Sequence, residues 1–423
     1  MSGIVQNNIL RSSGTVAVSA AGLNWSDTII TGSTATVEAG NGYWINTTSN
    51  TCTITLPSSA EKGDQIVLID YARTWGTNKI IIDSNGLNYQ SNDDTYTVEY
   101  TTDGQSVNIV YSDATKGWIP LEDDVTANEP VAPPTQKGIF GYGDTGSNVS
   151  ITNLVSSSGV IASDTTGVGT ARNALASASY GGDKAIFGYG TTGSNVSLTN
   201  LVSNSGVVAA DVTGVGTARA YPSAASYGGD KAIFGYGDTG SNSSLTNLVS
   251  NSGVVASDVS GVGTARSRLA AASYGSGLAI FGYGYTGSIV SMSNLVSSLG
   301  VVATDTSGVG TARYNLAAAS YGEDKAIFGY GDTGGSSGQV SMTNLVSNSG
   351  VVASDVSGVG TARIRIAATN YGGDKALFGY GQSGATRLSM SNLVNNSGVV
   401  AADVTGVGTA RGYLAAAGYS ISA

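Results

Sequence analysis

The chain has 423 residues, of which 61 are glycine, 41% are apolar and only 11% are charged. It has no histidine and one cysteine, Cys52, which excludes a Ser-His-Asp triad, a Cys-His dyad, a histidine metal site and an intrachain disulfide. The formal net charge of −10 argues against nucleic-acid binding. We expect no cofactor and no metal. We also expect no membrane insertion, because no run of 18 apolar residues occurs. Residues 1–20 show no pattern of a secretory signal.

Residues 1–121 contain no repeat and are expected to fold as a separate β-domain. All four tryptophans of the chain, Trp25, Trp44, Trp75 and Trp118, lie here and indicate a separate aromatic core. The expected fold is an antiparallel β-sandwich. The strand candidates are 15–19, 42–46, 52–56, 65–69, 79–83, 95–100 and 106–111.

A second segment, residues 122–136, contains three of the six prolines: Pro130, Pro133 and Pro134. Proline-rich segments of this kind adopt extended, semi-rigid conformations. We therefore predict a linker between the first domain and the rest of the chain.

Residues 137–423 consist of six copies of one unit centred on the string IFGYG. The phenylalanines of these copies follow one another at steps of 47, 47, 47, 47 and 50 residues. Each unit contains four short strand candidates, typified by LAAASYG, KAIFGYG, SLTNLVS and VVASD, which glycine-rich turns separate. A four-stranded unit of this length is typical of a β-propeller blade, so the sequence predicts a six-bladed propeller.

The phase of the repeats predicts how this propeller closes. The first copy begins at Lys137 with the second strand of a unit, and the chain ends with a first strand, LAAAGYS, at 414–420. The C-terminal strand can complete the blade that begins at Lys137, which leaves no open sheet edge between the first and last blades.

Each repeat also contains an aspartate followed eight residues later by an arginine. Because the pair is the same in every repeat, we interpret it as a structural clamp on the connection between neighbouring blades. The pairs are Asp164 and Arg172, Asp211 and Arg219, Asp258 and Arg266, Asp305 and Arg313, Asp355 and Arg363, and Asp403 and Arg411.

The repeats differ mainly at two places, the loop after the second strand and the two residues after each Thr-Ala-Arg. In an up-and-down blade both places fall on one face, whereas the Gly-Gly-Asp and Asn-Ser-Gly turns of the other face hardly change. One uniform face and one diversified face indicate a recognition module, although drift in unconstrained loops is the alternative. The candidate receptor-binding residues are Tyr221, Arg268, Tyr314, Asn315, Arg365, Arg387 and Tyr413.

The repeat resembles the kelch motif. Arg172 precedes the first strand, the turn 180–182 carries a Gly pair, and the apolar strand 185–190 ends in glycine. Gly-Tyr-Gly stands where kelch repeats have Gly-Gly, and the later kelch tryptophan is absent. Segments 40–57, 63–70, 78–85 and 107–120 resemble modules of tail fibres and other structural proteins of tailed phages.

The resemblance of the first domain implies a virion protein, and together with the one diversified face it suggests a fibre or tail-tip component located in the virion. Its first domain would attach to other tail or baseplate proteins and form a homo-oligomer, with a trimer favoured. Its propeller would bind a host surface receptor, such as a glycan. A structural or decoration protein of the head or tail is the alternative. A glycan depolymerase is disfavoured because no paired carboxylates stand out in the repeat loops, so we expect no enzymatic activity.

Overall fold

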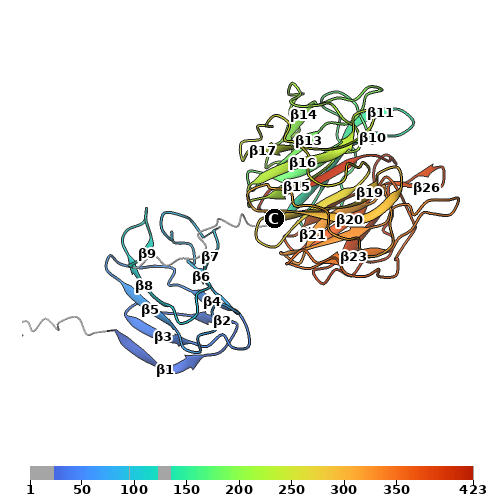
Figure 1. Ribbon diagram of the computed structural model, residues 1–423. Coiled ribbons are helices and arrows are strands. Elements are labelled where there is room, and N and C mark those ends of the chain that lie inside the picture. Colours follow the sequence, from blue (N-terminus) through green and yellow to red (C-terminus); the bar gives the residue numbers. More distant parts are fainter. Residues whose placement is uncertain (1–22, 95, 122–134, 423) are drawn as a thin grey trace, which may run out of the picture. The chain divides into compact units, whose positions relative to one another are not determined.

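The computed structural model describes residues 23–94, 96–121 and 135–422, and the chain forms two compact units, Met1–Val131 and Ala132–Ala423 (Figure 1). Every regular element in these described residues is a β-strand, which confirms the expected all-β class. The same residues include no helix with the length and apolar character needed to cross a membrane.

Unit 1 consists of two sheets with the strand orders β1-β3-β5-β8-β9 and β2-β4-β6-β7. From β1 to β6 the chain alternates between the two sheets, as in the coils of a β-solenoid. Its strands are β1 (Asn24–Ile30), β2 (Thr34–Thr36), β3 (Asn41–Ile45), β4 (Cys52–Thr55), β5 (Gln65–Asp70), β6 (Ile80–Asp83), β7 (Val98–Tyr100), β8 (Ser106–Tyr111) and β9 (Trp118–Pro120).

The expected antiparallel sandwich is wrong in the direction of its strands. Strand β3 runs parallel to both β1 and β5, and β4 runs parallel to both β2 and β6. The reason is the alternation, because a chain that returns to a sheet only after crossing the other sheet travels in the same direction each time. Antiparallel pairing begins only at β7, β8 and β9.

The strand candidates of this unit were largely correct. Those from residue 42 to residue 111 correspond to β3 through β8, although β7 begins only at Val98. Strands β1, β2 and β9 were missed, and the candidate 15–19 lies outside the described residues. One apolar core joins both sheets and includes the fully buried Trp75 and Trp118. The expected aromatic core is therefore present. Trp25 is not part of it, because Trp25 is 40% exposed and packs on the ring of Trp44 outside the core.

The described residues of unit 2 form six three-stranded antiparallel sheets and one small hairpin. Their strands are, sheet by sheet, β10 (Lys137–Asp144) and β11 (Asn148–Val155) with β29 (Ala415–Tyr419); β12 (Ala176–Tyr180), β13 (Lys184–Gly188) and β14 (Thr199–Val202); β15 (Ser223–Tyr227), β16 (Lys231–Asp238) and β17 (Asn242–Val249); β18 (Ala270–Tyr274), β19 (Leu278–Tyr285) and β20 (Ile289–Val296); β21 (Ala317–Tyr321), β22 (Lys325–Gly329) and β23 (Thr343–Val346); and β24 (Ala367–Tyr371), β25 (Lys375–Gly379) and β28 (Ser391–Val394). The hairpin comprises β26 (Gln382–Ser383) and β27 (Thr386–Arg387).

The two ends of unit 2 meet in one sheet. Strand β29 pairs antiparallel with β10, and Lys137 lies opposite Tyr419. This confirms the expected pairing of the last strand with the first repeat. The linker boundary needs a correction, because Thr135 is buried and Asn370 donates to its hydroxyl, while Gln136 bonds to the backbone of Ser420. These two residues belong to unit 2, and residues 122–134 lie outside the described part.

The predicted fourth strand of each repeat is not a regular strand. After the Asn-Ser-Gly turn, the chain touches the third strand only through isolated bridges, such as Val202 with Val208 and Thr199 with Val212. The reason is local, because the VVASD segment presents alternate valines to solvent, with Val207 65% exposed. An edge segment with little apolar surface to bury has only a few backbone bonds to hold it.

Neighbouring sheets contact one another through their first strands in a cycle, β12, β15, β18, β21, β24, β29 and again β12. Behind these strands, the tyrosine of each Gly-Tyr-Gly packs on the phenylalanine of the next sheet, as Tyr142 does on Phe187 at 5.2 Å. Gly141 makes room for that ring, since a Cβ there would lie 2.7 Å from Phe187. Each repeat therefore carries one phenylalanine, and a glycine of the preceding repeat makes room for its ring.

Candidate functional site

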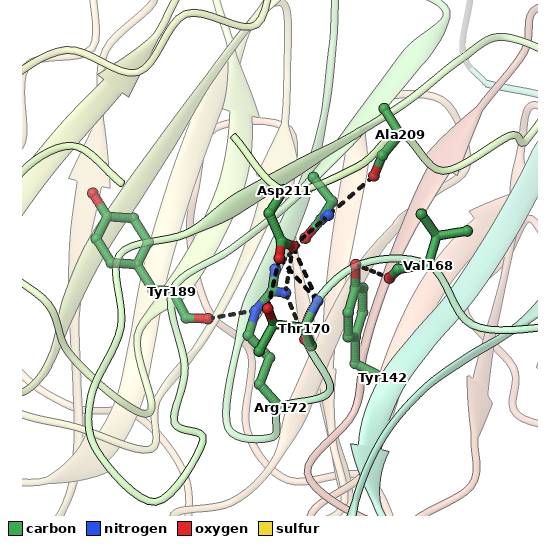
Figure 2. Close-up of polar contacts among 8 residues, drawn as sticks. Tyr142, Val168, Thr170, Arg172, Tyr189, Ala209 and Asp211 are labelled. Carbon is green, nitrogen blue, oxygen red and sulfur yellow. Dashed lines mark hydrogen bonds and ion pairs between the residues drawn. The ribbon is translucent and has the colours of Figure 1, made fainter. Parts of the chain in front are cut away.

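The arginine of each Thr-Ala-Arg is a buried clamp between two sheets, and the six clamp arginines are Arg172, Arg219, Arg266, Arg313, Arg363 and Arg411. Arg172 donates to the backbone oxygens of Tyr189 and Thr170 and, at 2.7 Å, to the side-chain oxygen of Asn200 (Figure 2). Its guanidinium also lies over the Tyr142 ring of the preceding sheet, 4.3 Å from the centroid. One side chain thus joins two sheets through hydrogen bonds on one side and a cation–π contact on the other.

The clamp was expected, but its acid partner was assigned wrongly. Arg172 lies 3.9 Å from Asp211, and not beside Asp164, which faces Arg411 instead. Five of the six clamp arginines lead into a sheet and lie within 4.0 Å of the aspartate that follows the third strand of that same sheet. The sequence spacing of eight residues joins two different sheets, which is why proximity along the chain misidentified the partner. Arg363 departs from the others, because its NH1 donates to the backbone oxygen of Met390.

The clamp aspartates are bound on several sides. Asp211 accepts from the amide and hydroxyl of Thr170 and from the amide nitrogen of Asn200. Desolvation by itself would raise the pKa of Asp211, but these hydrogen bonds and the charge of Arg172 outweigh it and lower the pKa below its usual value. The other five clamp aspartates show the same direction of pKa shift for the same reasons.

Two residues after each clamp arginine, six equivalent residues form a closed ring of backbone hydrogen bonds. Each amide donates to the carbonyl of its equivalent in the preceding repeat, from Tyr221 to Ala174 at 2.8 Å and onward. The amide of Ala174 completes the cycle by donating to Tyr413 at 2.9 Å. We call these the ring residues: Ala174, Tyr221, Arg268, Asn315, Arg365 and Tyr413.

All ring residues have left-handed backbone conformations, with φ between 52° and 58°. Glycine adopts this region freely, asparagine tolerates it, and other residues incur about 1–2 kcal/mol of strain. Glycine occurs at none of the six positions, and four of them carry tyrosine or arginine. The large side chains therefore sit where the backbone by itself would favour glycine.

The ring residues surround a small pocket of about 70 Å³ at the centre of one face. Its floor consists of the next residue of each repeat, Leu175, Pro222, Leu269, Leu316, Ile366 and Leu414, which are all buried. The pocket thus has an apolar floor and a rim of diverse side chains. None of the residues that line it is acidic, and none is a serine, threonine or cysteine.

The order of the residues divides this rim into two halves. Ala174 lies between Tyr413 and Tyr221, and its small side chain lets the two rings meet edge to face at 5.5 Å. Opposite them, Asn315 lies between Arg268 and Arg365. Arg365 lies over the Tyr413 ring at 4.3 Å and Arg268 over the Tyr221 ring at 4.8 Å, so cationic and aromatic halves adjoin.

Of the rim side chains, Tyr413 differs from a free phenol. Burial, with a smaller contribution from Tyr221, raises the pKa of Tyr413 to about 12, although the charges of Arg365 and Arg268 act in the opposite direction. Arg365 also donates to the side chain of Gln382 at 2.7 Å, which fixes its position against the variable loop.

Five of the seven candidate binding residues line the pocket, namely Tyr221, Arg268, Asn315, Arg365 and Tyr413. Tyr314 stands just outside, between Tyr285 and the guanidinium of Arg268. Arg387 lies apart and forms an ion pair of 2.5 Å with Asp144. Their role in binding remains a prediction. The floor residues were missed, although each directly follows a diversified pair and is almost always a large aliphatic residue.

Both diversified places lie on the same face. The first residue of each diversified pair bridges to the start of a variable loop, as Asn173 does to Thr191 and Tyr314 to Asp332. Neighbouring loops also touch, since Asn148 donates to the backbone of Thr191 and Asn195 to that of Asp238. The chain enters unit 2 away from these loops, where Thr135 contacts Asn370 of β24 and Gly418 of β29.

No family model and no curated protein matches this chain. Within the described residues, no cluster of three histidine, cysteine or acidic side chains is suited to hold a metal ion.

Proposed function

We propose that unit 2 is a closed, six-bladed, kelch-like β-propeller whose ring face binds a host surface receptor, and that the protein is a fibre or tail-tip component of a tailed-phage virion. Two observations support the closed ring. The first strands contact one another in a cycle, and the backbone hydrogen bonds of the ring residues return from Ala174 to Tyr413.

The observation that carries the binding role is the contrast between backbone and side chain at the ring. Six positions share one backbone conformation and one hydrogen-bonding pattern, yet they carry alanine, asparagine, two tyrosines and two arginines. Strained residues that persist without structural need point to function. Tyrosine and arginine are also the residues that contribute most to recognition surfaces.

The role is one of binding and not of catalysis. Hydrolysis of a glycosidic bond ordinarily needs two carboxyl groups on either side of the bond. The residues that line the ring pocket include no aspartate or glutamate. The virion assignment rests on the resemblance of segments 40–57, 63–70, 78–85 and 107–120 to tailed-phage modules. On this proposal, unit 1 attaches to other virion proteins and forms a trimer.

The test is binding of the labelled 423-residue protein to intact host cells. We expect saturable binding that is lost when Tyr221, Arg268, Arg365 and Tyr413 are changed together to alanine. The matched control changes Lys184, Lys231, Lys325 and Lys375 to alanine, because these partly exposed lysines pair with aspartates in the uniform turns. Equal binding by the two variants, or none by the unchanged protein, would refute the receptor role.

A second candidate function, decoration of the head or tail, is favoured by one observation. The valine after each Asn-Ser-Gly or equivalent turn is 61–65% exposed, so unit 2 presents apolar side chains at six repeated positions, Val160, Val207, Val254, Val301, Val351 and Val399. Packing against neighbouring subunits would bury them. Labelling of intact virions with an antibody against unit 2 separates the two functions, since decoration predicts a regular pattern over the head or the tail tube.

A further inference from the structure

Unit 2 has nine arginines, and two of them are neither buried clamps nor, in the part of the chain that the structure describes, paired with an acid. Six are the buried clamps, and Arg387 is paired with Asp144. The remaining two, Arg268 and Arg365, both belong to the ring, and among the described residues no carboxylate lies within 4.0 Å of either guanidinium. In a chain with a net charge of −10, two half-buried cations without an acid partner at one pocket are unusual.

The two arginines stand on either side of Asn315, which places two forked donors and one amide along the same half of the rim. Guanidinium groups bind carboxylates through paired hydrogen bonds, and such charge-assisted bonds are about twice as strong as neutral ones. This half of the rim is therefore suited to an anion.

The opposite half of the rim is suited to a different surface. Tyr221 and Tyr413 meet over Ala174 and present aromatic carbon next to the aliphatic floor. Aromatic side chains with a polar tip are suited to ligands that have an apolar face and hydroxyl groups. A sugar ring has such a face, whereas a bare inorganic anion would leave the two tyrosines unused.

We propose that the ring pocket binds the terminal acidic sugar of a host glycan, with its carboxylate between Arg268 and Arg365 and its ring against Tyr221 and Tyr413. The pocket of about 70 Å³ is far smaller than the roughly 300–1,000 Å³ of sites that enclose a whole ligand. It therefore takes one end of a chain and leaves the rest of the glycan outside. This inference rests on the proposed receptor function and specifies its ligand.

The test measures binding of the full-length protein to free sugars by ligand-observed NMR. The probes are glucuronic acid, galacturonic acid, N-acetylneuraminic acid and 3-deoxyoctulosonic acid, each as its methyl glycoside and each beside the uncharged methyl ester. We expect at least one acid to bind at least about tenfold more tightly than its ester. The change of both Arg268 and Arg365 to alanine should abolish that preference, whereas the paired change K231A and K375A, which removes the same charge, should preserve it.

Inorganic phosphate serves as a further probe. Binding of phosphate with an affinity equal to that of the best acidic sugar would overturn the inference, because the tyrosines would then contribute nothing. Failure of all four acids, or equal binding of acids and esters, would also overturn it.

The two proposals fail in different ways. If host cells bind the protein through the ring but the acids do not compete, the receptor function stands and the acidic ligand is wrong. If an acid binds at the ring but host cells do not bind the protein, the preference of the pocket for an acidic sugar stands, whereas the receptor function and the host glycan as the source of that sugar are wrong.

Discussion

Arg266 and Arg268 lie two residues apart in one connection and have opposite environments. Arg266 is fully buried, donates to the backbone oxygens of Tyr283 and Thr264 and to Asn294, and lies 3.8 Å from Asp305. Arg268 is half-buried at the pocket rim, where its guanidinium faces aromatic rings and no acid among the described residues. The same pair recurs at Arg363 and Arg365.

The comparison shows how one short connection serves two purposes. The residue that every repeat shares holds two sheets together, while the residue that varies forms the rim of the pocket. Because the clamp supplies the cohesion, the ring side chains are free to differ without loss of the fold. Each of the following predictions compares these two sets of residues, and the largest expected effect comes first.

The change Arg266→Ala should lower the free energy of unfolding of unit 2 by about 3–5 kcal/mol, because it leaves buried acceptors and Asp305 without their cation. The matched change Arg268→Ala should lower it by less than about 1 kcal/mol. Calorimetry of the full chain measures both. All four tryptophans lie in unit 1, so its fluorescence transition is an internal control and should not move. Equal destabilisation by the two changes would contradict the division of roles.

Acid should weaken unit 2 through the clamp aspartates. The pKa of Asp305 is below its usual value in the folded protein, so the stabilisation is present above the unfolded-state pKa of about 3.9 and is lost as the pH falls through the folded value. We expect the melting temperature of unit 2 to fall steeply below about pH 4. In Asp305→Asn the fall should be shallower. An identical slope for both proteins would show that this carboxylate is not involved.

Alkali should act both on the tyrosines that contact the clamp arginines and on the ring residue Tyr413. Burial raises the pKa of clamp-associated Tyr142 and Tyr283 and of the ring residue Tyr413 to about 12. The stabilisation is present below the unfolded-state pKa of about 10 and is lost as the pH rises from there towards 12. A spectrophotometric titration of the folded protein should show these phenols ionising late, and Tyr413→Phe should remove one late group. Ionisation of every tyrosine near pH 10 would contradict this.

The smallest effect on stability should come from Arg268→Gly, and it should coincide with a large effect on binding. Glycine relieves the strain of a φ of 58°, which offsets the lost contact with Tyr221, so the stability should change by less than about 1 kcal/mol in either direction. Binding to host cells should nevertheless drop markedly. Unfolding and binding measured on the same preparation decide the matter, because parallel losses would indicate that Arg268 is only structural.

Much of unit 2 could be predicted from the sequence, because its repeats make each strand appear six times. The first three strands of each unit and the pairing of the C-terminal strand with the strand at Lys137 are confirmed. The prediction of a fourth strand was wrong, since sequence alone does not show how many backbone hydrogen bonds the VVASD segment retains at the sheet edge. In unit 1 the strands β3 to β8 were found, but β1, β2 and β9 were missed, and so was the parallel direction of β3 and β4, because strand composition is similar in both arrangements.

By itself, the sequence determined where the diversity of this protein lies, because unequal residues stand out against six equal repeats. It also identified five of the residues that line the ring pocket. Only the tertiary structure decided which partners these residues have. Arg172 faces Asp211 and not Asp164, Arg387 is held by Asp144, and Arg268 and Arg365 share one rim without an acid partner among the described residues. Partnership depends on which sheets adjoin, and the pairing of β29 with β10 brings together residues that sequence distance keeps apart.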